Sequence, residues 1–390
     1  MAGALEGIRV LDLTAMFNGP LATMILGDQG ADVIKVEPPG AGDIIRQFGI
    51  QRSGIGPIFQ TVNRNKRSVV LDLRKEQGRA LLLELSDRAD VLIQNFRPGV
   101  MDRLGLGAAL LRERNPGLIY VSISAYGETG PMATRPAFDS LIQAVSGMAS
   151  SQGDEEPELI RNSLCDKLTG LQVAQAITAA LFARERGAGG QHLRISMLDA
   201  SISFLWTDAM QLYTYLGEEV AERRRPFPKA LPTRDGGHIL ISCITDAQFQ
   251  ATCRALGLEP LIEDVRFANL SARSEHMHDL LALLAEQTQR HDTEAVCARL
   301  EAEDAPHAAV TALHAVPTHP QVIANETVVR LEHPHCGELQ VPQPVEHFDV
   351  TPSTIRSLAP LLGEHTDEVL AELGHDDADR KQLRDEGVIG

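Results

Sequence analysis

The first 200 residues alternate short β-rich apolar runs with helical stretches, and this alternation limits the fold more than any other feature. Strands and helices in regular succession form right-handed βαβ units, which build a mainly parallel sheet covered by helices. The predicted strands span residues 8–13, 32–37, 68–73, 90–96, 118–124 and 192–198. Ligands of such sheets bind beyond the carboxyl ends of the strands, so we expect a functional site in the loops that follow them.

A cationic connector broken by Pro and Gly, at about residues 222–238, separates this pattern from a different one. Apolar residues at helical spacing predict long helices at about 166–184 and 199–216 before it. After it we predict a strand at 238–243 and mostly helices as far as residue 316. The connector is therefore the predicted domain boundary.

Charge and composition exclude several classes of partner. The net charge is −17, which makes nucleic acid and anionic membranes poor partners. No apolar run approaches the roughly 18–20 residues of a membrane span, and the N-terminus lacks the form of a signal peptide. Five widely spaced cysteines without a CxxC pair argue against disulfides and structural zinc. We predict a soluble, reduced, cytoplasmic protein with no metal site.

Residues 95–99, at the end of a predicted strand, are a candidate binding loop. Arg97 offers fixed donors for phosphate, Asn95 donates and accepts hydrogen bonds, and Phe96 can pack against a base. Arg103 lies further along, in the helix that this loop begins. The alternative is a strand-to-helix turn with solvated arginines, and these residues alone do not decide between the two.

The segment Asn-Arg-Asn-Lys-Arg-Ser at residues 63–68 is a second candidate, directly before a predicted strand. Three cations and two amides in six residues suit a phosphate-rich ligand. Solvated loop charge is the alternative.

Asp166 begins the predicted helix Asp-Lys-Leu-Thr-Gly and allows two interpretations. Asp is a preferred N-cap residue, and a cap contributes roughly 1 kcal/mol to helix stability. A carboxylate at a helix start beside a ligand cleft can also attack a thioester carbonyl and form a mixed anhydride, with nearby backbone N–H groups holding the oxyanion. No GxGxxG, GxSxG or P-loop motif supports another chemistry.

Taken together and in this order, these segments resemble the class III CoA-transferase family, which includes formyl-CoA and carnitine CoA-transferases. The resemblance spans nearly the whole chain. The matching stretches include VLDLT…GP, LGDQGADVIKVE, NRNKRSVVLDLR, ADVLIQNFRPGVMDRLGL, NPGLIYVSISAYGETGP, DKLTGLQVAQAITAALFARERGAGGQ and APLLGEHTDEVLAELG.

The resemblance implies an α/β fold and a homodimer of two interlinked ring-shaped protomers. It implies a large Rossmann-like domain with a parallel sheet, residues 1–220 completed by 331–390, and a small α+β domain, residues 221–330. Coenzyme A or acyl-CoA is then a substrate, with no tightly bound cofactor. Asp166 would become acylated and then carry CoA as a thioester. The implied CoA contacts are Leu71, Arg74, Asn95, Phe96, Arg97, Arg103 and the backbone near Phe17 and Asn18.

Two departures from the family pattern bear on the reaction. The branch that epimerises 2-methylacyl-CoAs places His before Asp where this chain has Phe138-Asp139, so one of the two bases is missing. The Gly-rich loop that covers the nucleophile in some transferases is replaced by the connector around residues 225–232. Transferase is therefore favoured. A racemase-type isomerase with Asp166 as the base and a non-catalytic acyl-CoA-binding protein stay open as alternatives.

The resulting hypothesis is a CoA-transferase that moves CoA from an acyl-CoA donor to a small free carboxylic acid. Arg223, Arg224 and Arg225 suggest an acceptor with a second carboxylate, for which succinyl-CoA would be a natural donor. A solvated linker is the alternative interpretation of these arginines.

Overall fold

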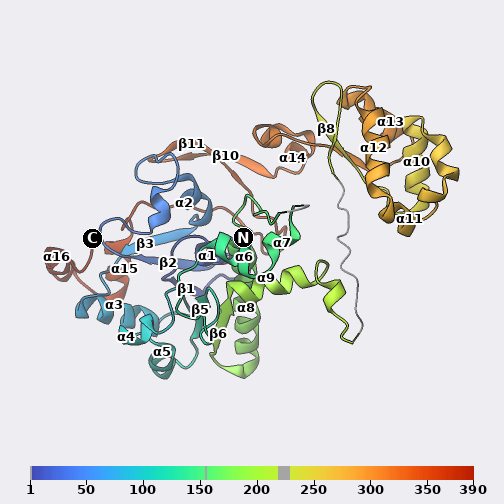
Figure 1. Cartoon of the computed structure of the whole chain (residues 1–390). Coiled ribbons are helices and arrows are strands. Elements are labelled where there is room, and N and C mark those ends of the chain that lie inside the picture. The colour runs from blue at the N-terminus through green and yellow to red at the C-terminus, as the bar shows by residue number, and fades with distance from the viewer. Residues whose placement is uncertain (1, 154–155, 218–228) are drawn as a thin grey trace. The chain divides into compact units, whose positions relative to one another are not determined.

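The computed structural model describes residues 2–153, 156–217 and 229–390, drawn in colour in Figure 1. The chain divides into two units. The first comprises Met1–Leu216 with Glu326–Gly390, and the second comprises Gly217–Asn325. Arg223, Arg224 and Arg225 lie outside the described residues.

A six-stranded parallel sheet forms the centre of the first unit, in the order β3-β2-β1-β4-β5-β6. This is the strand order of a doubly wound Rossmann fold. The strands are β1 (Arg9–Asp12), β2 (Asp32–Glu37), β3 (Lys66–Val70), β4 (Val91–Gln94), β5 (Ile119–Ser124) and β6 (His192–Ser196). Each lies within or next to a predicted strand, so the predicted α/β fold with a parallel sheet is confirmed.

Helices cover both faces of this sheet because its strands are apolar on both sides. On one face, α1 (Asn18–Asp28) and α8 (Leu164–Ala183) pack against strand residues such as Val10 and Val121. On the other, α3 (Glu76–Asp87), α5 (Ala108–Arg114) and α15 (Thr366–Leu373) pack against residues such as Leu11 and Leu92. Other α-helices of the first unit are α2 (Pro57–Val62), α4 (Val100–Arg103), α6 (Asp139–Val145), α7 (Met148–Ser151), α9 (Met197–Trp206) and α16 (Asp377–Asp385).

The C-terminal segment completes the first unit. The hydroxyl of Thr366 accepts a hydrogen bond from the backbone N–H of Val70, at 3.1 Å, and Ile389 forms a β-bridge with Leu71. An antiparallel hairpin, β10 (Val328–His333) and β11 (Gly337–Pro342), precedes it. The helix predicted at 199–216 is shorter in the structure, because α9 ends at Trp206.

The second unit has its own apolar core, centred on Phe249 and Phe267. Its antiparallel sheet contains β7 (Leu231–Pro232), β8 (His238–Ile241) and β9 (His307–Ala309). Its helices are α10 (Asp246–Leu256), α11 (Leu270–Glu275), α12 (Met277–Thr288), α13 (Thr293–Ala302) and α14 (Pro320–Ala324).

A network of buried charges lies at the carboxyl end of β1. The ammonium of Lys66 donates to Asp12 at 2.9 Å, and both side chains are fully buried. Lys66 also donates to the carbonyl of Pro20, at the start of α1. Burial alone would raise the pKa of Asp12, but Lys66, Lys35 and two hydroxyl donors hold this pKa well below its usual range. The carboxylate is therefore ionised and joins β1, β3 and α1.

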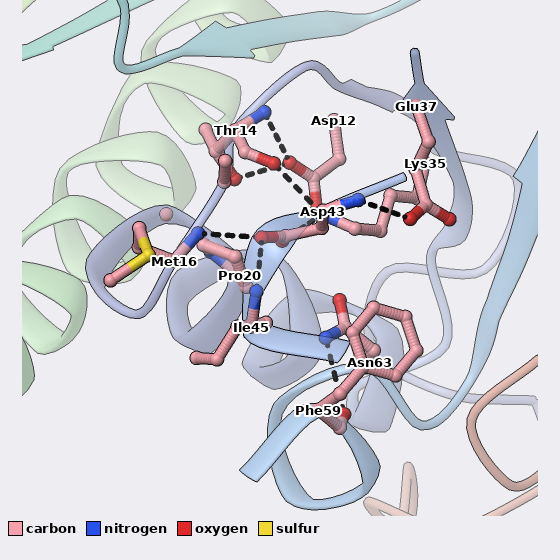
Figure 2. A network of polar contacts seen from close by, with 12 residues as sticks. Asp12, Thr14, Met16, Pro20, Lys35, Glu37, Asp43, Ile45, Phe59 and Asn63 are labelled. Carbon is pink, nitrogen blue, oxygen red and sulfur yellow. Dashed lines mark hydrogen bonds and ion pairs between the residues drawn. The ribbon is translucent and has the colours of Figure 1, made fainter. Parts of the chain in front are cut away.

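A second buried pair, Lys35 and Asp43, holds the loop between β1 and α1. The two side chains are 3.0 Å apart, and Lys35 donates to the carbonyl of Thr14 at 2.8 Å. Figure 2 shows the carboxylate of Asp43 facing the backbone of Met16 and Ile45, whose N–H groups donate to it at 3.1 Å. Met16 has a positive φ of 69°, a conformation that L-residues rarely adopt without such support.

The prediction that the cationic segment 63–68 binds phosphate is wrong, and so is its alternative of solvated charge. Arg64 and Lys66 are buried, and they pair with Asp28 and Asp12. Arg67 pairs with Asp32, Glu368 and Glu372. These three cations form ion pairs within the protein. The acids that neutralise them come from distant parts of the chain, so the local sequence does not reveal the pairs.

Replacing Lys66 with Met should lower the free energy of unfolding by about 3–5 kcal/mol, because it leaves the charge of Asp12 buried without its partner. Urea denaturation followed by circular dichroism measures this change. Arg114→Ala is the matched control, since it breaks an exposed pair with Asp87 and should change stability little. Equal effects of the two substitutions would show that the buried pair has no special role.

Candidate active site

Three segments meet at the carboxyl end of the parallel sheet. Asn18 is the first residue of α1, Asn95 follows β4 directly, and Asp166 lies in the first turn of α8. Their side chains form one hydrogen-bonded chain. The amide nitrogen of Asn95 donates to the amide oxygen of Asn18 at 3.1 Å, and the amide nitrogen of Asn18 donates to Oδ1 of Asp166 at 2.9 Å.

The interpretation of Asp166 as an N-cap is wrong. Helix α8 begins at Leu164, so Asp166 is its third residue, and its carboxylate accepts from Asn18 of α1. The N–H of Asp166 instead donates to Oδ1 of Asp139, the first residue of α6, at 3.0 Å. Gln143 donates to the other oxygen of Asp139 at 2.6 Å. Asp139 therefore fixes the backbone of Asp166, and Gln143 of the same helix α6 fixes the side chain of Asp139.

Close packing of α1 against α8 brings Asn18 within reach of Asp166. Gly170, one turn after Asp166, makes this possible, because a Cβ there would lie 2.8 Å from the carbonyl oxygen of Asn18 and 3.1 Å from the side chain of Leu21. The Gly of the Asp-Lys-Leu-Thr-Gly stretch thus has a packing function. It lets two helices approach where the candidate carboxylate lies.

The surroundings of Asp166 make its carboxyl group unusually basic. Burial and the neighbouring charge of Asp139 raise the pKa of Asp166 to about 6, and the hydrogen bond from Asn18 opposes this rise. Such a carboxylate is mostly ionised at neutral pH and is more basic than an exposed one. A perturbed pKa of this kind is typical of functional carboxyl groups.

Two arginines follow β4 at the same edge of the sheet. The side chains of Arg97 and Arg103 are exposed, and neither has a hydrogen-bond or ion-pair partner among the described residues. Phe96 is 37% exposed beside them. Two free guanidinium groups next to an accessible ring suit a ligand that carries phosphates and a base.

The other residues implied by the resemblance lie in different surroundings. Leu71 is 1% exposed, packs in the core and forms a β-bridge with Ile389. Arg74 is exposed and pairs with Asp72 at 2.8 Å. The ring of Phe17, which precedes Asn18, lies 6.0 Å from the ammonium of Lys167.

A cavity of about 390 Å³ opens beside the start of α8. Its lining combines exposed apolar side chains with polar ones, and includes Phe138, Asp139, Gln143, Leu159, Arg161 and Ser163. Arg161 has no ion-pair partner among the described residues. In the part of the chain that the structure describes, no three His, Cys, Asp or Glu side chains cluster as metal ligands would, and no helix has the length and apolarity to span a membrane.

The contacts of the Asn18 side chain and of Asp139 with Asp166 were not predicted from the sequence. The family resemblance implies only backbone contacts near Asn18, and Asp139 is predicted only as part of the Phe138-Asp139 pair that disfavours an isomerase. The hydrogen bonds to Asp166 span 148 and 27 residues of sequence, and no local pattern indicates such partners.

The family model for CoA-transferase family III matches residues 5–366. The chain belongs to this family. It is 36% identical to a protein of Fusarium pseudograminearum named acyl-CoA transferase, over 99% of this chain and 88% of that protein. It is 33% identical to the human succinyl-CoA:glutarate CoA-transferase, over 99% of this chain and 90% of that protein. A crystal structure of a CAIB/BAIF family protein from Brucella suis matches with a TM-score of 0.83 at 33% identity, covering 96% of this chain and all of that one.

Membership of family III confirms the predicted transferase class, since relatives such as the human protein and a formyl-CoA:oxalate CoA-transferase of Escherichia coli are named CoA-transferases. Phe138, at the position where the isomerase branch carries a His, is 64% exposed at the start of α6 and has no proton to exchange. Within the described part of the chain, the side chains that form hydrogen bonds with Asp166 are the amide of Asn18 and the carboxylate of Asp139.

Replacing Asp139 with Asn should move the acidic limb of the pH–activity profile to lower pH. The wild-type limb should lie near pH 6, because a carboxylate must be ionised to attack and the pKa of Asp166, the candidate nucleophile, is raised to about 6. Removing the charge of Asp139 lowers this pKa. The measurement is kcat/KM against pH. Asp199→Asn removes a carboxylate from the first turn of α9 and should leave the limb unchanged. An acidic limb that stays in place in Asp139→Asn would show that the limb does not report the ionisation of Asp166.

Proposed function

We propose that this family III enzyme moves CoA from an acyl-CoA donor to a free carboxylic acid through covalent intermediates on Asp166. The observation that carries the proposal is the position of this carboxylate: it is partly buried, held by Asn18 and Asp139, and its pKa is raised to about 6. An ionised carboxylate of that basicity is suited to attack a thioester.

The first half of the reaction transfers CoA to the enzyme. Oδ2 of Asp166 attacks the thioester carbonyl, a C–O bond forms, the C–S bond breaks, and CoA leaves as its thiolate. The thiolate then attacks Cγ of Asp166. A Cγ–S bond forms, the Cγ–O bond breaks, and the donor acid leaves as a carboxylate, with CoA now held as a thioester of Asp166.

The second half repeats these steps in reverse order with the acceptor. Its carboxylate attacks Cγ of the Asp166 thioester and displaces the thiolate, and the thiolate then attacks the acceptor carbonyl and frees Asp166. One thioester replaces another, so the reaction is nearly isoenergetic. The task of the protein is to position the reactants and exclude water.

The free arginines beside β4 support a CoA site at this edge of the sheet. Arg97 and Arg103 lie on the same edge as Asp166, and Phe96 offers a surface for the base. The cavity beside the start of α8 supports a place for the acyl group, since Asp139 and Arg161 are both among its lining residues. A dicarboxylic acyl group such as succinyl fits this combination of apolar walls and Arg161, a cation without an ion-pair partner among the described residues.

The names of relatives support succinyl-CoA as a donor. The human relative is named for succinyl-CoA and glutarate. A relative from Chloroflexus aurantiacus, which is 31% identical, is named for succinyl-CoA and D-citramalate. We also propose that the protein acts as a homodimer, as the family resemblance implies.

Incubation with succinyl-CoA followed by hydroxylamine should modify Asp166 and no other residue. The reason is that both proposed intermediates, the aspartyl anhydride and the aspartyl thioester, have an activated carbonyl at Asp166 that hydroxylamine attacks. Peptide mass spectrometry locates the modification. Asp166→Asn should abolish it, whereas Asp139→Asn should retain it, which separates the two neighbouring carboxylates. An unmodified Asp166 across several acyl-CoA donors would overturn the proposal in favour of an isomerase or a binding protein.

Replacing Arg97 and Arg103 together with Ala should weaken CoA binding by roughly 100-fold, since each charged hydrogen bond contributes about 1.5 kcal/mol. Isothermal titration calorimetry with CoA and with dephospho-CoA measures the loss. The wild type should prefer CoA, and the double variant should lose most of that preference. Arg114→Ala, an arginine already paired with Asp87, should bind both ligands as the wild type does. Unchanged CoA affinity in the double variant would place the phosphates elsewhere.

A further inference from the structure

The orientation of the Asn18 amide is determined by its partners. Its oxygen accepts from the N–H of Gly19 at 2.7 Å and from the amide nitrogen of Asn95 at 3.1 Å. A flipped amide would place its NH2 group against these two donors and its oxygen against the Asp166 carboxylate. The nitrogen of Asn18 therefore faces Asp166, with an N···Oδ1 distance of 2.9 Å.

Asn95 fixes this amide in place. Its own amide forms two hydrogen bonds with the backbone of Ala15, one from the N–H of Ala15 at 3.0 Å and one to the carbonyl at 2.8 Å. Asn18 is only 6% exposed. The donor that faces Asp166 thus belongs to a side chain that is buried and held from behind, which is the preorganisation that stabilises developing charge.

The two oxygens of Asp166 are consequently not equivalent. Oδ1 is bound by Asn18, whereas Oδ2 has no hydrogen-bond partner among the described residues. The free oxygen is the one available to attack an acyl donor. Once Oδ2 is acylated, Oδ1 becomes the carbonyl oxygen of the aspartyl anhydride and then of the aspartyl thioester.

We propose that the side-chain amide of Asn18 is the oxyanion donor for the reactions at the Asp166 carbonyl carbon. The inference rests on the proposed function, in which Asp166 forms both covalent intermediates. When the CoA thiolate attacks Cγ, the carbonyl electron pair moves onto Oδ1, next to the N–H of Asn18. Collapse of the tetrahedral intermediate restores the C=O bond and expels the carboxylate. The acceptor carboxylate meets the same donor when it displaces the thiolate.

The first step of the reaction does not use this donor. When Asp166 attacks the acyl-CoA, the negative charge develops on the oxygen of the donor thioester, which is a different atom from Oδ1. Loss of Asn18 also removes a hydrogen bond that lowers the pKa of Asp166, so the carboxylate becomes more basic. Removing the amide should therefore slow the thiolate attack on Cγ and leave the rate of anhydride formation unchanged.

The test is rapid mixing with succinyl-CoA at a pH above the acidic limb, an acid quench and intact-protein mass spectrometry. Succinyl and CoA adducts differ in mass, so the two intermediates are measured separately. In Asn18→Leu, which is similar in volume and has no donor, the succinyl adduct should form at about the wild-type rate. The CoA adduct should form on the order of 100-fold more slowly, as for loss of one oxyanion donor, and the succinyl adduct should accumulate.

Two further variants separate the missing donor from altered packing. Asn18→Ala should give the same accumulation, because it also lacks the amide and adds no bulk. Met197→Leu changes the other side chain that the Asn18 amide contacts, at 3.4 Å, and should keep the wild-type ratio of the two adducts. Thermal unfolding of each variant shows that the folded protein is being compared.

Wild-type rates for both adducts in the Asn18 variants would overturn the inference, and so would an equal slowing of both steps, which indicates a structural role. Absence of both adducts in the wild-type protein is a different outcome. It would overturn the proposed function itself, and this inference with it.

Discussion

The buried pair of Lys66 and Asp12 is the interaction on which the active-site end of the sheet depends. Its two charges are fully enclosed, so each requires the other and the hydroxyl and carbonyl groups around them. The pair joins β1, β3 and the start of α1, and the neighbouring pair of Lys35 and Asp43 holds the loop between them. Together they fix the backbone that leads into Asn18, so the position of the Asn18 side chain depends on these buried ion pairs.

The geometry at Asp166 shows how a parallel α/β sheet assembles a reactive group from remote parts of the chain. The sheet brings the loops after β1 and β4 to one edge, and the close approach at Gly170 brings α8 to the same place. Asn18 and Asp139 then act on different parts of Asp166: one binds a carboxylate oxygen, and the other binds the backbone and raises the pKa. Among the described residues, one oxygen of this carboxylate accepts a hydrogen bond from Asn18 and the other has no hydrogen-bond partner.

The incorrect sequence predictions share one cause. The cations at 63–68 have the composition of a phosphate site, but Arg64 and Lys66 are neutralised by Asp28 and Asp12, which lie far away in sequence. Asp166 has the local features of an N-cap, yet the helix starts two residues earlier and the carboxylate accepts from another helix. A local sequence pattern shows which residue types suit a role. The ion-pair or hydrogen-bond partner of each side chain depends on how distant segments pack together.

The sequence by itself determined the parallel α/β architecture, the membership in a CoA-transferase family and Asp166 as the candidate nucleophile. Periodicity and strand-helix alternation act over short windows, so they are visible without a structure. Only the tertiary structure decided that Asn18 donates to Oδ1 of Asp166, that Asp139 holds its backbone and that Arg97 has no ion-pair partner among the described residues. These roles depend on donor and acceptor atoms from distant segments lying about 3 Å apart, which is the usual hydrogen-bond distance in proteins.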